Sequence, residues 1–202
     1  MEYFLELFLG GLTRGSIYAL IALGYTMVYG IVQLINFAHG EIYMIGAFTA
    51  LIVASVLSLL GWPPIAILLI ASFAAVLYSC AYGWTLEKIA YKPLRKAPRL
   101  SALISAIGMS LFLQNYVLLA QTSDFLPFPS LIQDWEWMEP WAHIIGTPEI
   151  VIILVTTAVM LCLTFLIKYT RIGKAMRATA QDKDMAMLVG INVNQVISFT
   201  FI

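Results

Sequence analysis

The stretch Leu34-Ile-Asn-Phe-Ala-His-Gly-Glu-Ile-Tyr-Met-Ile-Gly-Ala-Phe48 places Asn36, His39, Gly40 and Glu41 between two long apolar runs. Gly40 provides a backbone that can break a helix, and Asn36 is a good N-cap for a helix that follows. Glu41 would then lie in the first helical turn, where the helix dipole favours negative charge. The stretch therefore predicts a break between two membrane helices. Its residue types fit two structures, a short cytosolic turn and a discontinuous helix that lines a solute pathway.

The composition is that of an integral membrane protein. The chain has 202 residues, of which 61% are hydrophobic and 11% are charged, and its mean hydropathy is +0.90. A soluble domain carries about 25% charged residues. The formal net charge is zero, so nothing in the balance of charge predicts a nucleic-acid partner. We expect all of the spanning segments to be α-helices.

Five apolar runs are long enough to cross a bilayer, because a spanning helix needs roughly 20 residues. They are residues 12–35, 42–60, 65–86, 101–120 and 149–167. Another apolar run begins over residues 196–202, where the given sequence ends. We therefore expect a single membrane domain over residues 1–202, an all-α polytopic helical bundle. It would hold about five complete spans and the start of a sixth, with the C-terminal spans missing.

Basic residues orient these spans. One group follows the third span and consists of Lys88, Lys92, Arg95, Lys96 and Arg99; another follows the fifth and consists of Lys168, Arg171, Lys174, Arg177 and Lys183. Residues 121–149 contain no Lys or Arg. The positive-inside rule places both basic groups in the cytosol and residues 121–149 outside. The N-terminus is then outside, and residues 36–41 lie in the cytosolic half.

Aromatic residues fall at both ends of the predicted spans, as in the aromatic belts of membrane proteins. The outer belt consists of Trp62, Trp135, Trp137 and Trp141, and the inner belt of Tyr82, Trp84, Tyr91 and Tyr169. The external loop is long enough for a short amphipathic helix that carries Phe125, Phe128 and the three loop tryptophans. Such a helix could lie on the membrane surface or dock a partner.

Two amides lie within the fourth span. Asn115 falls on one helical face with Ser101, Ser105 and Gly108, and Gln114 lies beside that face. Polar side chains at this depth need partners. They either form hydrogen bonds between helices or line a translocation path.

Recognisable catalytic patterns are missing from the sequence. His39 and Glu41 are two residues apart, so they do not share a helical face. Arg171-Ile-Gly-Lys-Ala175 lacks the first glycine and the final Ser or Thr of a phosphate loop. Cys80 and Cys162 lie in apolar runs without metal-ligand spacing. We expect no catalytic residue, no metal site and no bound cofactor in this chain.

Residues 171–192 are too polar to cross the membrane. Ala180, Asp184 or Met185, Leu188 and Ile191 fit helical spacing, and Gly190 followed by Asn192 is typical of a helix end. Small residues would keep such a helix thin enough to lie in a groove. The segment is either a surface connector between spans or a helix that docks into a cytosolic motor subunit.

Several strings resemble the permease subunits of bacterial branched-chain amino acid ABC importers, most closely the first of the two paired permeases. The strings are Gly15–Gly30, Ile35–Phe48 with its specific Asn-Phe-Ala-His-Gly-Glu core, Ala81–Trp84, Ala90–Arg95, Leu103–Tyr116 and Arg171–Ile191. Family members are longer and continue with further spans. The resemblance implies a multi-pass protein of the bacterial inner membrane, in contact with membrane lipid.

The resemblance also implies partners and roles. The partners are a second permease subunit, two cytosolic ATP-binding subunits that use ATP and Mg²⁺, and a periplasmic or lipid-anchored substrate-binding protein. The expected pathway residues are Asn36, His39, Gly40, Glu41, Gln114 and Asn115. The expected ATPase-coupling residues are Arg177, Ala180, Asp182, Asp184, Ala186, Leu188 and Gly190. The alternatives are a permease for urea or short-chain amides and a membrane scaffold that transports nothing.

Overall fold

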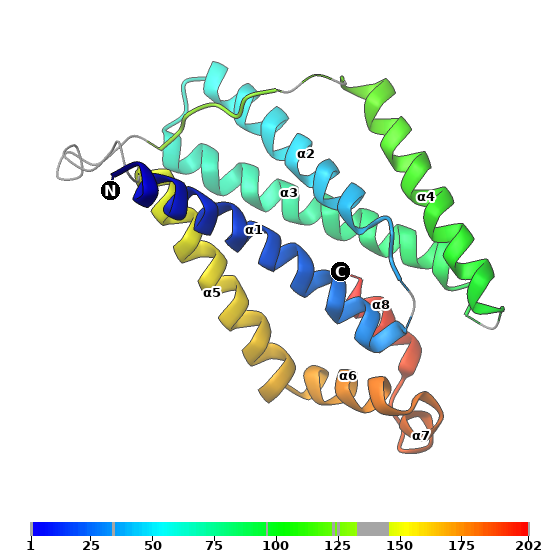
Figure 1. Ribbon diagram of the computed structural model, residues 1–202. Coiled ribbons are helices and arrows are strands. Elements are labelled where there is room, and N and C mark those ends of the chain that lie inside the picture. Colours follow the sequence, from blue (N-terminus) through cyan, green and yellow to red (C-terminus); the bar gives the residue numbers. More distant parts are fainter. Residues whose placement is uncertain are drawn as a thin grey trace.

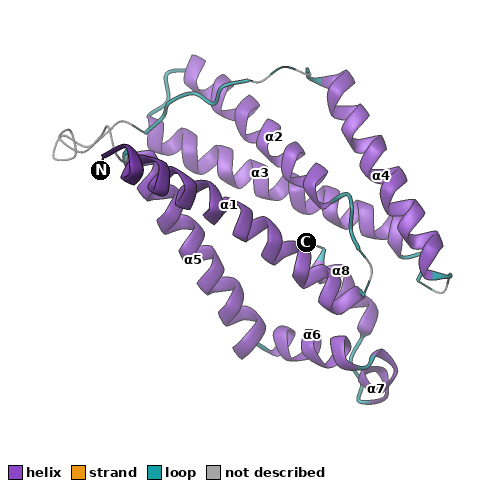
Figure 2. Ribbon diagram, in the orientation of Figure 1, coloured by secondary structure: helices purple, strands orange, loops and turns teal. Residues whose placement is uncertain are grey.

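The computed structural model describes residues 2–33, 35–95, 97–122, 124, 126–132 and 146–201, and every regular element in them is a helix (Figures 1 and 2). The elements are α1 (Glu2–Val32), α2 (His39–Leu59), α3 (Pro64–Leu86), the π-helix η1 (Glu87–Tyr91), α4 (Arg99–Ala120), α5 (Thr147–Tyr169), α6 (Arg171–Gln181), α7 (Lys183–Leu188) and α8 (Val193–Thr200). Five of these helices, with η1 continuing α3, are long and apolar enough to cross a membrane. The predicted polytopic helical bundle is confirmed.

The first helix is longer at its start and shorter at its end than predicted. It begins at Glu2 rather than residue 12, because nothing in residues 2–11 stops a helix; Gly10 and Gly11 are accommodated with open space around them. It ends at Val32 rather than residue 35, because Gln33 adopts a positive φ of 60°. The end of α1 is therefore set by the backbone of Gln33.

Among the long helices, α2 and α3 form a closely packed pair, which lies between α4 and the pair α1 and α5 (Figure 1). Helices α2 and α3 pack tightly because Gly46 has no side chain; a Cβ there would stand 2.5 Å from the Ser79 hydroxyl. The turn between them contains Gly61 at φ 72°, and Pro64 opens α3 as the sequence predicts. On the other side of the bundle α1 packs against α5, whereas α4 touches the rest mainly at η1 and α2.

One end of the molecule gathers the C-terminal end of α1, η1 and α6–α8, and we call it the basic end (Figure 1). Its core is a cluster of buried side chains that includes Val32, Leu86, Tyr91, Met176 and Ile197. The start of the predicted sixth apolar run forms α8, which packs into this cluster instead of lying apart from it.

The third span continues beyond Leu86 through η1, where the sequence predicts a basic loop. The Lys92 amide donates to the Glu87 carbonyl at 2.8 Å, five residues back, which defines a π-turn. This wider turn buries both Glu87 and Tyr91, at 1% and 2% exposure. Glu87 forms an ion pair with Arg95 and accepts a hydrogen bond from the Ser198 hydroxyl at 2.9 Å. The carboxylate thereby connects the end of α3 to α8.

The polar segment after α5 forms two helices rather than the single helix predicted. Asp182 separates them, because its side-chain oxygen accepts hydrogen bonds from the amides of Asp184 and Met185 and so starts a new helix. The residues that fit helical spacing have different environments. Ala180 packs against the core cluster, whereas Leu188 is 81% exposed.

The predicted aromatic belts are only partly visible. Trp62 and Trp84 are about half exposed at opposite ends of α3, and Tyr169 is exposed at the basic end of α5. Phe128 lies in an irregular stretch and is half exposed. Phe125, Trp135, Trp137, Trp141 and the amphipathic helix predicted for them lie outside the described residues.

Candidate functional site

The break after α1 turns the chain back along the helix that it has just left. His39, the first residue of α2, lies against Gly24, where an added Cβ would stand 3.0 Å from the imidazole Nε2. Gly24 precedes the end of α1 by eight residues, which corresponds to about 12 Å of helix rise. The chain therefore runs back alongside α1 before α2 begins, and the N-terminus of α2 lies inside the helical bundle.

Asn36 stabilises this connection between α1 and α2, although it does not cap α2 as predicted. The N-cap is Ala38, whose amide donates to the Asn36 side-chain oxygen at 3.1 Å. The Tyr91 hydroxyl donates to the same oxygen at 3.0 Å, so the π-helix holds the break in place. Gly40 is not the breaking residue; it is the second residue of α2, and the positive φ occurs at Gln33.

The polar residues of the break face two different sides of α2. His39 packs edge-to-face against Tyr25, with ring centroids 6.2 Å apart. With Asn36 it lines a mostly apolar cavity of about 440 Å³ between α1, α2, α5 and α8. Glu41 instead faces α4 and accepts a hydrogen bond from the Ser110 hydroxyl at 3.0 Å. As predicted, it lies in the first turn of α2.

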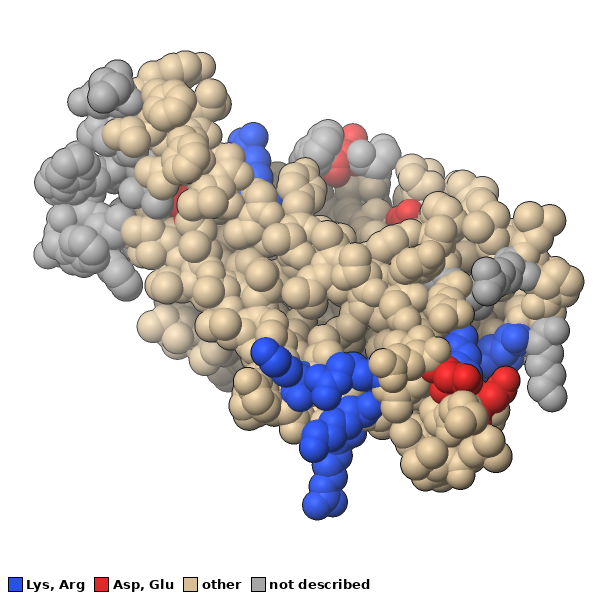
Figure 3. Space-filling model, turned by 60° about the horizontal axis from the view of Figure 1, so that its bottom comes forward, with Lys and Arg blue, Asp and Glu red and all other residues tan. Residues whose placement is uncertain are grey.

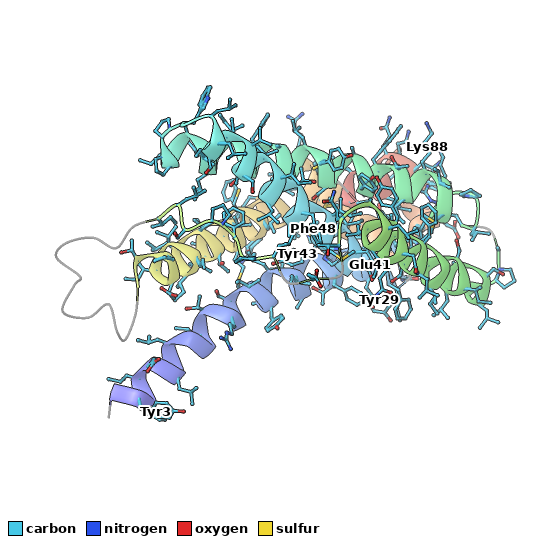
Figure 4. All side chains as sticks on the ribbon, turned by 90° about the horizontal axis from the view of Figure 1, so that it is seen from above. Tyr3, Tyr29, Glu41, Tyr43, Phe48 and Lys88 are labelled. Atoms are coloured by element: carbon cyan, nitrogen blue, oxygen red, sulfur yellow. The ribbon has the colours of Figure 1, made fainter. Side chains whose placement is uncertain are left out.

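A larger hollow of about 510 Å³ lies between α2, α4 and the chain that follows α4, and we call it the α2–α4 cleft. Its walls are mainly apolar and include Met44 and Phe48. Its polar lining residues are Gln114, Thr122 and Asp124. Glu41 lies beside α4 (Figure 4). Glu41 and Ser110 lie one helical turn before Met44 and Gln114, toward the basic end. The hydrogen bond between them therefore closes the cleft at that end.

The two amides of α4 are both exposed but differ in what they contact. Gln114 lines the cleft, whereas Asn115 donates from Nδ2 to the Leu111 carbonyl of its own helix at 2.8 Å. Of the predicted pathway residues, Gln114 lines the cleft, and Glu41 lies one helical turn away, at its hydrogen bond with Ser110. Asn36 and His39 line the other cavity, and Asn115 lies away from both.

The predicted coupling residues lie in α6, in α7 and in the turns that follow each of these helices. Ala186 is buried, but Met185, Met187, Leu188 and Val189 are 54–81% exposed, so α7 presents an apolar tip. Asp182 caps α7 and Asp184 lies exposed in its first turn.

Other residues join this segment to its surroundings. Gly190, at φ 90°, reverses the chain toward α8. The Arg177 guanidinium donates to the Lys168 carbonyl at 3.1 Å, which fixes the corner between α5 and α6. The Lys183 ammonium donates to the Val32 carbonyl at 2.8 Å. Lys183 thus ties the start of α7 to the end of α1, directly before the break.

The sequence did not predict three partners in these contacts: Ser110 for Glu41, Tyr91 for Asn36, and Glu87 for Arg95 and Ser198. Tyr91 and Asn36 are 55 positions apart, and Ser110 and Glu41 are 69 apart, so no local pattern links them. Only a lone acid among five basic residues distinguished Glu87 in the sequence.

The five candidate spans define a multi-pass membrane protein. Residues 7–202 match the model of one family, described as the permease component of branched-chain amino acid transport systems. The chain belongs to that family. It is 48% identical over 205 residues to the high-affinity branched-chain amino acid transport system permease protein LivH of Salmonella typhimurium and of Escherichia coli K12.

A further relative is the permease protein BraD of Pseudomonas aeruginosa, named for the same kind of transport system and 46% identical over 204 residues. Each of these alignments covers 99% of this chain and 66% of the relative. The chain thus spans slightly less than two thirds of the length of these relatives. No solved structure matches it.

Proposed function

We propose that this chain is the membrane-spanning permease subunit of an ATP-driven importer of branched-chain amino acids. The α2–α4 cleft carries the proposal. Its apolar walls suit an aliphatic side chain, and a few polar groups at its ends suit the charged ammonium and carboxylate. A permease for these solutes needs a path that binds weakly and mostly through apolar contacts.

Glu41 fits a gate at the inner end of this path, because it lies at the N-terminus of α2 and forms a hydrogen bond with Ser110 of α4. A charged carboxylate at the bilayer centre costs on the order of 3 kcal/mol, which the Ser110 hydroxyl and the N-terminus of α2 offset. Glu41 attracts the substrate ammonium when the cleft opens, and the first amides of α2 attract the carboxylate. Separation of α4 from α2 breaks the hydrogen bond to Ser110 and opens the inner end.

The energy for this movement comes from partner ATPases, in which ATP and Mg²⁺ are used. The exposed apolar tip of α7 docks into one of the two ATP-binding subunits, and Lys183 passes its displacement to the end of α1. The second permease subunit and a substrate-binding protein complete the importer. The Asn36–Tyr91 hydrogen bond then ties the break to η1, which packs against α4.

Leucine uptake by the assembled importer in proteoliposomes tests the role of the cleft. We expect Glu41→Ala and Ser110→Ala each to reduce uptake about tenfold, equivalent to roughly 1.4 kcal/mol of barrier. Asn115→Ala is the matched control, because this polar residue of α4 faces away from the cleft, and it should stay within about twofold of the wild type. Wild-type uptake by Glu41→Ala would refute the gate.

The same proteoliposomes test the substrate class. We expect isoleucine and valine to compete with leucine, and urea or acetamide to have no effect. Competition by urea without competition by valine would replace the amino acid by a short-chain amide as substrate. A complete absence of ATP-dependent uptake of any of these solutes by the assembled complex would favour a scaffold.

Docking through α7 is tested separately by co-purification of the ATP-binding subunits. Leu188→Ser with Val189→Ser removes exposed apolar surface without touching the core, so the helical content should not change. We expect the ATPases to be lost from the complex. Gln195→Ser, an exposed change at the same end of the molecule, should retain them. Intact complexes after the α7 change would leave α7 as a plain connector.

A further inference from the structure

A group of four basic residues lies at the corner where α5 ends and α6 begins. Lys168, Arg171, Lys174 and Arg177 are all exposed, and basic side chains project together from this end of the molecule (Figure 3). Arg177 reaches back to the Lys168 carbonyl, so residues nine positions apart lie together. Within the part of the chain that the structure describes, the one ion pair is Arg95–Glu87, and it lies elsewhere.

These four charges repel one another, and none of them forms an ion pair with another residue that the structure describes. The N-terminus of α6 adds partial positive charge at the same corner, because its first amides point toward it. The first turn of α6 carries no acidic residue. The corner therefore favours an anion from outside the chain.

The surface above the corner indicates which anion. Leu161, Phe165 and Tyr169 form a stripe along α5, each 62–66% exposed, and the rings of Phe165 and Tyr169 are in tilted contact with their centroids 5.2 Å apart. The stripe lies on about the last two and a half turns of a candidate membrane span and leads directly to the basic residues. Ile172, 44% exposed, extends the apolar surface into α6. The acyl chain of a lipid can lie along such a stripe while the headgroup of the same lipid contacts the cations.

We propose that this α5–α6 corner binds the phosphate headgroup of an anionic phospholipid from the cytoplasmic leaflet. Lys168, Arg171 and Lys174 neutralise the phosphate, and Phe165 and Tyr169 hold the first part of an acyl chain. Arg177, predicted as a coupling residue, keeps the corner closed through its bond to the Lys168 carbonyl. This inference needs only the membrane location of the chain, so it stands or falls independently of the proposed transport activity.

The test is equilibrium lipid binding to the purified chain in neutral detergent, with bound lipid counted by native mass spectrometry. Phosphatidylglycerol and phosphatidylcholine with identical acyl chains are the two probes. We expect phosphatidylglycerol to bind at least about tenfold more tightly, since each basic residue near a membrane surface contributes about fivefold. An equal affinity for the two lipids would overturn the proposal.

Arg171→Gln with Lys174→Gln should reduce phosphatidylglycerol binding about tenfold or more and leave phosphatidylcholine binding unchanged. Lys88→Gln with Lys92→Gln is the matched control, because it removes the same charge from exposed positions of the other basic group. The control should stay within about twofold. An equal loss in both variants would mean unspecific attraction by net charge and would overturn the site.

Two further arms separate a lipid from other anions. Phe165→Ala with Tyr169→Ala should weaken phosphatidylglycerol binding several-fold, and glycerol 1-phosphate should not displace the lipid. Displacement by glycerol 1-phosphate would mean a site for soluble phosphates. Arg171→Lys with Lys174→Arg, which retains both charges, should bind as the wild type does. Unchanged binding of phosphatidylcholine by the glutamine variant is the check that it remains folded. Loss of the ATP-binding subunits from the glutamine variant with lipid binding intact would mean a protein-docking surface instead.

Discussion

Removal of the buried Glu87 carboxylate is expected to destabilise the fold more than the loss of an exposed carboxylate does. The Glu87 side chain is 2% exposed, and that of its partner Arg95 is 16% exposed. The Glu87→Ala variant leaves a largely buried guanidinium whose Nε already has no hydrogen-bond partner. Breaking a buried pair from one side costs about 3–5 kcal/mol. We expect the lower end, about 3 kcal/mol, because Arg95 can turn its exposed part toward water.

Denaturant unfolding in mixed micelles, followed by circular dichroism of the helices, measures this cost. The Glu6→Ala variant is the matched control, since it removes an exposed carboxylate from α1 and should change stability by no more than about 0.5 kcal/mol. The double variant Glu87→Leu with Arg95→Met should be at least about 1 kcal/mol more stable than Glu87→Ala, because no charge is then left unpaired. A loss below about 1 kcal/mol for Glu87→Ala would refute the reasoning, as would a double variant that is less stable than it.

Three other predictions concern the basic end. Gly83→Ala should destabilise the fold by about 1–3 kcal/mol in the same unfolding assay, because the new Cβ would stand 2.2 Å from the Phe201 carbonyl oxygen; Gly108→Ala, which meets nothing within 4 Å, should be neutral or stabilising by up to about 1 kcal/mol. Asp182→Ala should cost about 1 kcal/mol through the lost cap of α7, and Asp182→Asn should restore most of it; equal losses in both would mean that the charge matters and the cap does not. Lys183→Met should leave the ATP-binding subunits attached but reduce uptake per ATP hydrolysed about tenfold, and an unchanged ratio would exclude Lys183 as the link to α1.

The sequence alone predicts the spans well because their signal is local. Long apolar runs, the Pro64 start of α3 and the two basic groups each lie within one continuous stretch. The polar break after α1 is found for the same reason. The residue that makes the break is not, because Gln33 has no intrinsic preference for a positive φ and adopts it through its tertiary surroundings.

The site depends on pairings that no local pattern contains. Glu41 and Asn36 are prominent in the sequence, yet Ser110 and Tyr91 become their partners only after α3, η1 and α4 have returned to the break. The sequence treats Gln114 and Asn115 alike. A rotation of 100° per residue separates them, and only the position of α4 decides which of the two faces the cleft.

The π-turn at η1 makes the length of this segment as important as its composition. One extra residue in a helical turn shifts the phase of everything that follows by about 100°. Deleting a single residue between Glu87 and Tyr91 would restore an ordinary α-helix and turn one of these two side chains away from the core. Alignments of this family should therefore show few gaps at η1, even where the residues themselves differ, and a one-residue deletion there should be far more harmful than most substitutions.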